Sequence, residues 1–350
     1  MTQGNGGHGI DSTSWRATIL PLPKRHSRGA ALGFCGGHVV GRVEAARGSS
    51  RGCWWPDGKP ELLGLEGHKE LGAGRAAGDL IPGNWRKDSG DMGAVVWRLN
   101  GTLLEGRELH DPAFAKTWAT GAGGGAVIGI GARPSQPGKR TPNVGLVWRD
   151  GTDAAVIEAE GEVRLFATDG VRVAGSINGR AALWPAIGAD PIDLSPAKMS
   201  MSEVEALDGD SQVGTAFKGF CARAGIWRGA AGTFSDLTPK GFQTSRAHGG
   251  AGGFQVGYVR VKENTRNGTP GSDNRAVVWE GAADRWFDLN ALLPAPYNAS
   301  IALAVEIRGN ELRICGSASQ VEVNDPGTPR ESHVVPVDHP VLWTARIQPG

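Results

Sequence analysis

Charged and aromatic side chains recur at similar places in this sequence, and their types fit acid–base or anion chemistry. Glu203 and Glu205 belong to one segment, and His248 belongs to the next segment of the same kind. A carboxylate beside a histidine can move a proton, and an arginine guanidinium binds carboxylates and phosphates. If the protein is an enzyme, the candidate catalytic residues are Glu203, Glu205 and His248. The candidate ligand-binding residues are Trp118, Arg164, Glu203, Arg246 and His248. The alternative is that these side chains pair with one another and line a solvated channel.

Motifs that usually mark a cofactor or a metal are incomplete. The glycine-rich run from Gly121 to Ala126 lacks the lysine of a nucleotide-binding loop. His333, Asp338 and His339 stand in a proline-rich segment and not at an established metal-binding spacing. Asp208-Gly209-Asp210 is not followed by the remaining ligands of a calcium loop. We therefore expect no metal site and no cofactor.

A repeat of about 46 to 48 residues must position the candidate residues, and this period is typical of propeller blades. The chain has 55 glycines and 12 tryptophans among 350 residues. Seven glycines, each expected to end a short strand, alternate with seven tryptophans, each expected to end the following strand. The glycines are Gly41, Gly78, Gly129, Gly175, Gly214, Gly257 and Gly316. The tryptophans are Trp55, Trp97, Trp148, Trp184, Trp227, Trp279 and Trp343.

The repeat predicts an all-β fold, a single closed seven-bladed β-propeller of four-stranded antiparallel blades. Short apolar runs separated by Gly-, Asp- and Pro-rich turns favour strands over helices. We expect the repeat tryptophans to fill the space between sheets and the glycines to allow close backbone approach or positive φ. The segment Ala17–Pro23 resembles an outer strand without a repeat in front of it, so we expect it to complete the last blade. The first strand of each blade should line the central channel.

The Val-Val-Gly, small-x-x-Trp and Asp-Leu pattern resembles the bacterial HAF-type extracellular repeat family. The resemblance covers nearly the whole chain from about Thr13. It implies a β-propeller and says little about function. HAF repeats carry His-Ala-Phe before the tryptophan, whereas this chain has Ala-Val-Val or Gly-Leu-Val there. The family is typically exported, which leaves export possible.

Composition limits the class of partner and the compartment. The 37 basic and 36 acidic residues exclude a protein that holds nucleic acid or a membrane through one strong basic field. We see no signal peptide and no apolar stretch long enough for a membrane span, so we expect a cytoplasmic monomer. The four cysteines are scattered, and reduced thiols are favoured over a bridge between Cys35 and Cys53. We predict a flexible tail over residues 1–12 and the propeller domain over residues 13–347.

Three functions are compatible with such a ring. The first is a non-catalytic binding or scaffold protein that uses rim loops or an axial funnel to hold a protein or a small polar ligand. The expected rim loops are Ala132–Asn143, Val261–Arg275 and Gln320–Pro340. The second is a lyase or hydrolase with its acid–base site in the funnel. The third is a sugar-binding lectin with one site per blade.

Overall fold

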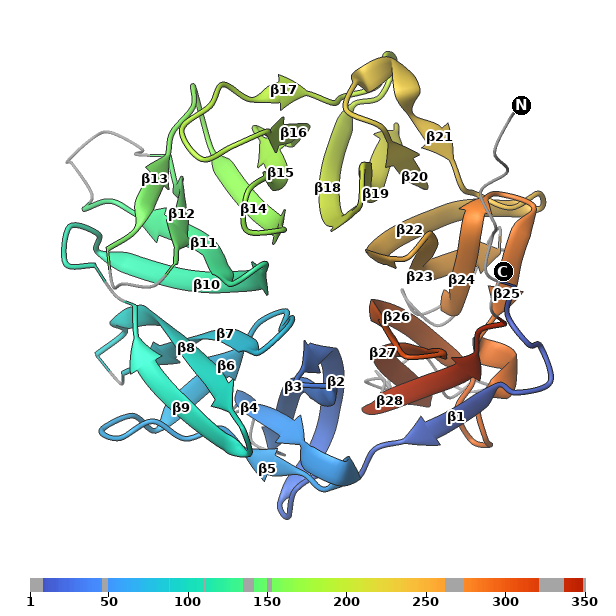
Figure 1. Cartoon of the computed structure of the whole chain (residues 1–350), viewed down its shortest axis with the longest axis horizontal. Coiled ribbons are helices and arrows are strands. Elements are labelled where there is room, and N and C mark those ends of the chain that lie inside the picture. The colour runs from blue at the N-terminus through green and yellow to red at the C-terminus, as the bar shows by residue number, and fades with distance from the viewer. Residues whose placement is uncertain are drawn as a thin grey trace, which may run out of the picture.

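Seven four-stranded antiparallel sheets surround a central axis in the computed structural model of the chain (Figure 1). The structure describes residues 9–45, 50–87, 89–109, 111–134, 142–149, 153–261, 274–320 and 337–348. In six sheets the four strands follow the order of the chain, and in the seventh the order is β26-β27-β28-β1; the first of the four lies nearest the axis in each sheet. The predicted seven-bladed, all-β propeller is confirmed.

The blades, numbered I to VII, have the following strands. Blade I contains β2 (His26–Cys35), β3 (His38–Ala45), β4 (Ser50–Trp55) and β5 (Glu61–Leu62). Blade II contains β6 (Glu70–Ala73), β7 (Leu80–Arg86), β8 (Met92–Asn100) and β9 (Leu103–Glu108). Blade III contains β10 (Lys116–Gly123), β11 (Ala126–Ala132), β12 (Val144–Trp148) and β13 (Ala155–Ile157). Blade IV contains β14 (Val163–Thr168), β15 (Val173–Ile177), β16 (Arg180–Trp184) and β17 (Ile192–Asp193).

The remaining three blades complete the ring. Blade V contains β18 (Met201–Asp208), β19 (Ser211–Lys218), β20 (Cys221–Trp227) and β21 (Ser235–Asp236). Blade VI contains β22 (Phe242–Ala251), β23 (Phe254–Val261), β24 (Asn274–Ala282) and β25 (Arg285–Asp288). Blade VII contains β26 (Ala299–Arg308), β27 (Glu311–Gln320), β28 (Val337–Arg346) and the N-terminal strand β1 (Arg16–Ile19). Three short 3₁₀ turns lie at Pro56–Gly58, Ala231–Thr233 and Asn290–Leu292.

The N-terminal strand closes the ring, as predicted. Strand β1 pairs antiparallel with β28, with Arg16 opposite Thr344 and Ile19 opposite Val341. Trp15 and Leu20, at either end of β1, are buried. This pairing covers the outer edge of β28, which would otherwise offer unpaired backbone groups to another chain.

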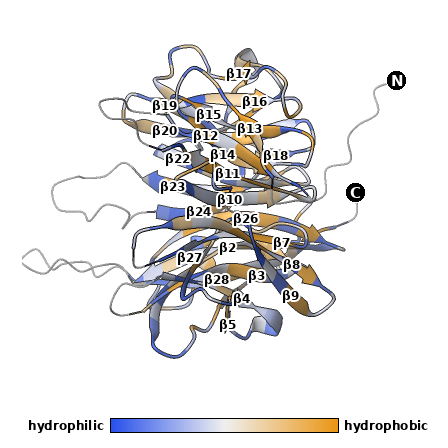
Figure 2. Ribbon diagram, turned by 90° about the vertical axis from the view of Figure 1, so that its left-hand side faces the viewer, coloured by the Kyte–Doolittle hydropathy of each residue, from blue (hydrophilic) through white to orange (hydrophobic). Residues whose placement is uncertain are grey.

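The core is divided among the contacts between neighbouring blades. The seven repeat tryptophans are at most 2% exposed, and each belongs to a different apolar cluster. Trp97, for example, packs in a cluster that combines Val40 of blade I with Leu71 and Trp85 of blade II. Figure 2 shows the blades stacked edge-on, with many hydrophobic residues along their strands.

Six of the seven repeat glycines lie inside the second strand of their blade, so the expectation that they end strands was wrong. In six blades the first strand carries one extra residue, a β-bulge that follows the partner of the repeat glycine. A Cβ on Gly129 would lie 1.9 Å from the carbonyl oxygen of Trp118, and one on Gly214 would lie 2.1 Å from that of Glu203. Only glycine allows this approach.

Blade II departs from the predicted alignment. Gly78 lies in a turn at φ +63°, and no atom lies within 4 Å of where its Cβ would be. The equivalent of the other repeat glycines is Gly83, where a Cβ would lie 2.1 Å from the carbonyl oxygen of Gly72. The predicted glycine was wrong by five residues, because the sequence Val-Gly is absent from β7 and a proline, Pro82, stands before Gly83.

Several other expectations have a structural outcome. All four cysteines are free, and Cys35, Cys53 and Cys315 are buried. No helix in the described ranges is long and apolar enough to cross a membrane. Of the predicted tail, residues 1–8 lie outside the described residues, and Ile10 forms a bridge with Ile347. Most of the three expected rim loops, at 135–141, 262–273 and 321–336, also lies outside them.

Candidate ligand site in the central channel

The four residues singled out beside the repeat glycines occupy equivalent backbone positions. The carbonyl groups of Trp118, Arg164, Glu203 and Arg246 each face the repeat glycine of their own blade. The same position is held by small or apolar residues in the other three blades. These residues are Ala30, Gly72 and Ile301. Equivalent positions on the seven first strands therefore carry very different side chains.

The bulge residues form a second set of equivalent positions, two residues further along the first strands. Most of them are apolar or uncharged: Leu32, Thr120, Phe166 and Leu303. The bulge residues of blades V and VI are Glu205 and His248. The only acid and the only histidine among these six residues are therefore neighbours.

Glu205, His248 and Arg75 form one hydrogen-bonded cluster across the channel. His248 Nδ1 lies 2.9 Å from Glu205 Oε2, and Arg75 Nη2 donates to the same oxygen at 2.5 Å. Arg75 Nη1 also donates to the backbone carbonyls of Glu205 and His248, at 3.1 and 3.3 Å. Arg75 follows β6 in blade II, so its side chain links that blade to blades V and VI.

Charge around Glu205 is set by burial and by its two partners. Burial opposes ionisation of this carboxyl, but His248 and Arg75 outweigh burial and lower its pKa well below the ordinary value. Glu203 behaves in the opposite way. Burial and then the negative charge of Glu205 raise the pKa of Glu203, although Arg246 pairs with it.

A cavity of about 180 Å³ lies at this cluster. Arg75, Glu205 and His248 form its polar wall, and the side chains of Leu32, Phe166, Leu303 and Val305 line its apolar part. The cavity thus combines a few fixed polar groups with an apolar surface, as small-molecule sites commonly do.

The other predicted residues do not join this cavity. Arg164 pairs with Glu162 at 2.8 Å, and its side chain is 57% exposed. Trp118 is half-buried and does not line the cavity. Glu203 and Arg246 form an ion pair beside the cluster, and the negative charge of Glu205 contributes to the raised pKa of Glu203. Of the six candidate side chains, only those of Glu205 and His248 line this cavity, and Glu203 and Arg246 lie beside it.

The remaining motifs have structural roles where they are described. Asp208 accepts hydrogen bonds from the backbone N–H groups of Gly252 and Gly253, both at 2.8 Å, and so ties the hairpin of blade V to that of blade VI. The run Gly121–Ala126 forms the end of β10 and the turn into β11. His333 lies outside the described residues. Among the residues placed by the structure, no three His, Cys, Asp or Glu side chains are grouped as metal ligands would be.

Comparison with known proteins supports the architecture. No protein-family model matches this sequence, and no curated protein matches it either. A puromycin hydrolase complexed with PGG has a TM-score of 0.55 at 11% identity, over 86% of this chain and 52% of that chain. A prolyl endopeptidase has a TM-score of 0.52 at 10% identity, over 84% of this chain and 48% of that chain. YCF48 bound to D1 peptide has a TM-score of 0.51 at 12% identity, over 98% of this chain and all of that chain.

The likeness shows a shared propeller fold. The chain spans about half the length of the puromycin hydrolase and of the prolyl endopeptidase, and all three identities are too low to carry a function. The resemblance to HAF-type repeats is supported only at the level of the propeller.

Arg75 is the residue of the cluster that sequence reasoning missed. It stands eight residues before Gly83, and the residues eight before the glycines of blades I, III, IV, V and VI are all glycine or alanine. They are Gly33, Gly121, Ala167, Ala206 and Gly249. An arginine at a position that is small in these five blades would have been the signal, but the same spacing gives Arg308 in blade VII, and Arg75 stands there only when Gly83 replaces Gly78 in the alignment.

Proposed function

We propose that this protein is a non-catalytic binding propeller that holds a small polar ligand in its central channel. The observation that carries the proposal is the convergence of Arg75, Glu205 and His248 on one cavity from blades II, V and VI. Blade II is separated from blades V and VI by two other blades, and a cluster of this kind is not needed to close the ring. The proposal requires no cofactor.

The hydrogen bonds of the cluster leave specific atoms for a ligand. Glu205 Oε2 is hydrogen-bonded to both Arg75 and His248 Nδ1. The other carboxylate oxygen, Oε1, and the other ring nitrogen, His248 Nε2, have no hydrogen-bond partner among the described residues. A ligand that offers both a hydrogen-bond donor and an acceptor would satisfy them. Leu32, Phe166 and Leu303 would cover an apolar portion, and the volume of about 180 Å³ limits the ligand to a small molecule.

A ligand search with a matched variant tests the proposal. Saturation-transfer NMR against a library of small polar metabolites should identify compounds that bind the wild-type protein. His248→Phe, which fills the cavity and removes Nε2, should abolish this binding, whereas Arg164→Met, outside the cavity, should leave it intact. If every compound binds His248→Phe as well as the wild type, the channel is not the ligand site. If no compound binds at all, the binding proposal fails.

An enzyme is the second candidate, and one observation favours it. A buried carboxylate that holds Nδ1 of a histidine orients the ring and leaves Nε2 to exchange a proton with a substrate. The neighbouring Glu203 has a raised pKa, which suits a general acid. Two of the structurally similar proteins are, by name, a hydrolase and an endopeptidase. Three results together would favour the enzyme over the binding protein. The wild type should turn over a ligand found in the NMR search, His248→Ala should abolish this turnover, and Glu203→Gln should shift its pH profile.

Two further possibilities have less support. YCF48, a propeller of similar length, is bound to a peptide, so a protein partner at the rim remains part of the proposal. A lectin needs an exposed aromatic residue in each blade, but the seven repeat tryptophans are buried and cannot contact a sugar.

A further inference from the structure

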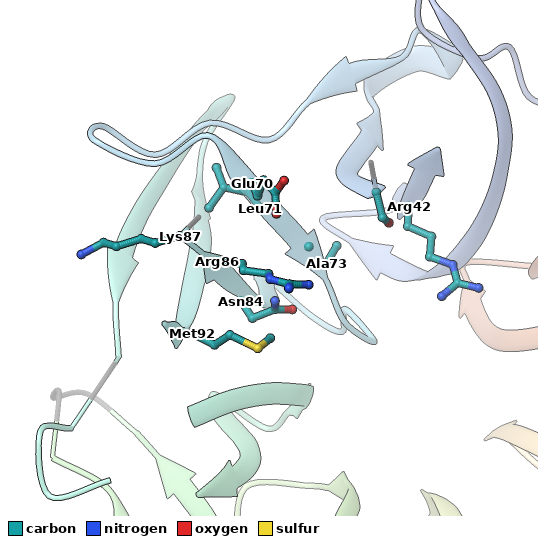
Figure 3. A pocket seen from close by; sticks show the side chains of 10 residues that line it. Arg42, Glu70, Leu71, Ala73, Asn84, Arg86, Lys87 and Met92 are labelled. Carbon is teal, nitrogen blue, oxygen red and sulfur yellow. The ribbon is translucent and has the colours of Figure 1, made fainter. Parts of the chain in front are cut away.

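A second and larger cavity, of about 620 Å³, lies between blades I and II. It shares no lining residue with the cavity at Glu205. Strand β3 contributes Arg42, and β7 contributes Asn84 and Arg86. Figure 3 shows these three side chains together with the apolar side chains of Leu71 and Met92.

The charges of this cavity are unbalanced. Its lining contains three cations, Arg42, Arg86 and Lys87, and one acid, Glu70, which is a difference of two positive charges. No ion pair is formed by any of the four within the described ranges. Lys87 Nζ instead lies 4.9 Å from the ring centre of Trp85, and Figure 3 shows its side chain directed away from the other lining residues.

Arg86 has an acid within reach and does not use it. Its backbone partner across β6 is Glu70, and opposite charges on facing residues commonly pair. Figure 3 shows the guanidinium of Arg86 extending away from Glu70, over Ala73 and toward the side of Arg42. The cation is therefore presented to the cavity.

Asn84 adds a side-chain amide next to Arg86 (Figure 3). Its side chain lies over Gly72, so close that a Cβ on that glycine would be 2.9 Å from Asn84 Oδ1. Gly72 holds the position that Trp118, Glu203 and Arg246 hold in other blades, so the missing side chain opens this space. The half-buried amide has no hydrogen-bond partner in the part of the chain that the structure describes.

We propose that this cavity, which Arg42 lines from blade I and Arg86 from blade II, binds a small phosphorylated molecule. A phosphate monoester carries about −1.5 to −2 charge at pH 7, and the lining supplies two guanidinium groups, those of Arg42 and Arg86, for such an anion. Guanidinium groups bind phosphate oxygens through paired N–H donors. The Asn84 amide donates to the phosphate or to an adjacent hydroxyl, and the half-buried Met92 contacts the body of the ligand. The volume falls within the range of about 300–1,000 Å³ that small-molecule sites occupy.

Calorimetric titration with three probes tests the site. The probes are glucose 6-phosphate, inorganic phosphate and succinate, and the proteins are the wild type, Arg42→Met, Arg86→Met and Arg228→Met. Arg228 is an exposed arginine of blade V and serves as the matched control. Glucose 6-phosphate should bind saturably, and each of the two cavity variants should weaken binding about tenfold or more, as expected for loss of a charge-assisted contact. The control should bind like the wild type.

Three results would overturn the proposal. Absence of saturable binding by glucose 6-phosphate shows that the cavity is not a phosphate-ester site. Equal loss in Arg228→Met shows non-specific charge attraction, and binding of succinate alone shows a dicarboxylate site. Unchanged thermal midpoints of the variants verify that they are folded. His248→Phe should bind glucose 6-phosphate like the wild type, which separates this site from the channel.

Discussion

Substituting Arg75 by methionine removes the side chain that links blade II to blades V and VI. Three hydrogen bonds disappear: one to Glu205 Oε2 and two to the backbone carbonyls of Glu205 and His248. Glu205, only 7% exposed, keeps its charge with one partner instead of two. Methionine retains a similar apolar length, so the substitution tests the charge and the hydrogen bonds more than the packing.

The expected cost follows from these contacts. A buried ion pair that loses one partner is destabilised by about 3–5 kcal/mol. Here His248 remains as a donor to the carboxylate, and the Arg75 side chain is 31% exposed, so water replaces part of the interaction. We therefore expect a loss of about 2–3 kcal/mol. With an unfolding entropy of about 2.1 cal/mol/K per residue, this corresponds to a fall in melting temperature of about 3–4 °C.

Thermal unfolding followed by circular dichroism from pH 7 to pH 3 measures both the size and the cause of this change. The lowered pKa of Glu205 stabilises the wild type above the ordinary carboxyl pKa, and this stabilisation is lost as the pH falls through the folded-state value. Arg75→Met should show a smaller loss on acidification, because one of the two partners that lower this pKa is gone. Arg164→Met, which breaks an exposed pair with Glu162, should cost only about 0–1 kcal/mol. If the two variants melt alike and respond alike to acid, the cluster does not stabilise the fold as described.

Three further predictions concern the fold. In a denaturant titration, Gly129→Ala should lower the free energy of unfolding by about 2–3 kcal/mol, because its Cβ would overlap the Trp118 carbonyl. Gly64→Ala, with open space at its Cβ, should leave the free energy of unfolding nearly unchanged. Deleting residues 12–23 should uncover the outer edge of β28. Size-exclusion chromatography should then show aggregation, and the melting temperature should fall. A monomeric product of unchanged stability would contradict closure by β1. Cys221, the half-buried thiol, should react first with a thiol reagent at pH 8. The reason is that burial raises the pKa of Cys35 and that of Cys53 to about 12. Fast labelling of the Cys221→Ser variant would contradict this.

The propeller was predictable from the sequence because the same local requirement recurs in each blade. A bulge in the first strand brings a carbonyl against the second strand, so a glycine is needed there, and a tryptophan is needed to fill the gap between sheets. These requirements concern single residues at a regular spacing. Blade II obeys them with a different local sequence, which is why Gly78 was chosen in place of Gly83.

The candidate site was only partly predictable, because backbone equivalence does not fix where a side chain ends. Arg164 and Arg246 share a position, yet Arg164 pairs with Glu162, just before its own strand, while Arg246 pairs with Glu203 on the neighbouring blade. A long charged side chain can reach several nearby partners, and the partners within reach differ from blade to blade. Arg75 could be found only after the three-dimensional alignment of blade II was known.

The channel lining differs between blades although the backbone repeats, and the two proposed sites follow from this difference. Because each first strand faces the axis in the same register, a change of side chain at one position alters the channel without disturbing the sheets. Blade II has Gly72 where blades V and VI have Glu203 and Arg246, so one side of the ring has open space bordered by arginines. The other side carries acids that are neutralised by Arg75 and Arg246. An anion is therefore attracted to blades I and II, while the cluster at Glu205 selects a ligand by hydrogen bonding rather than by net charge.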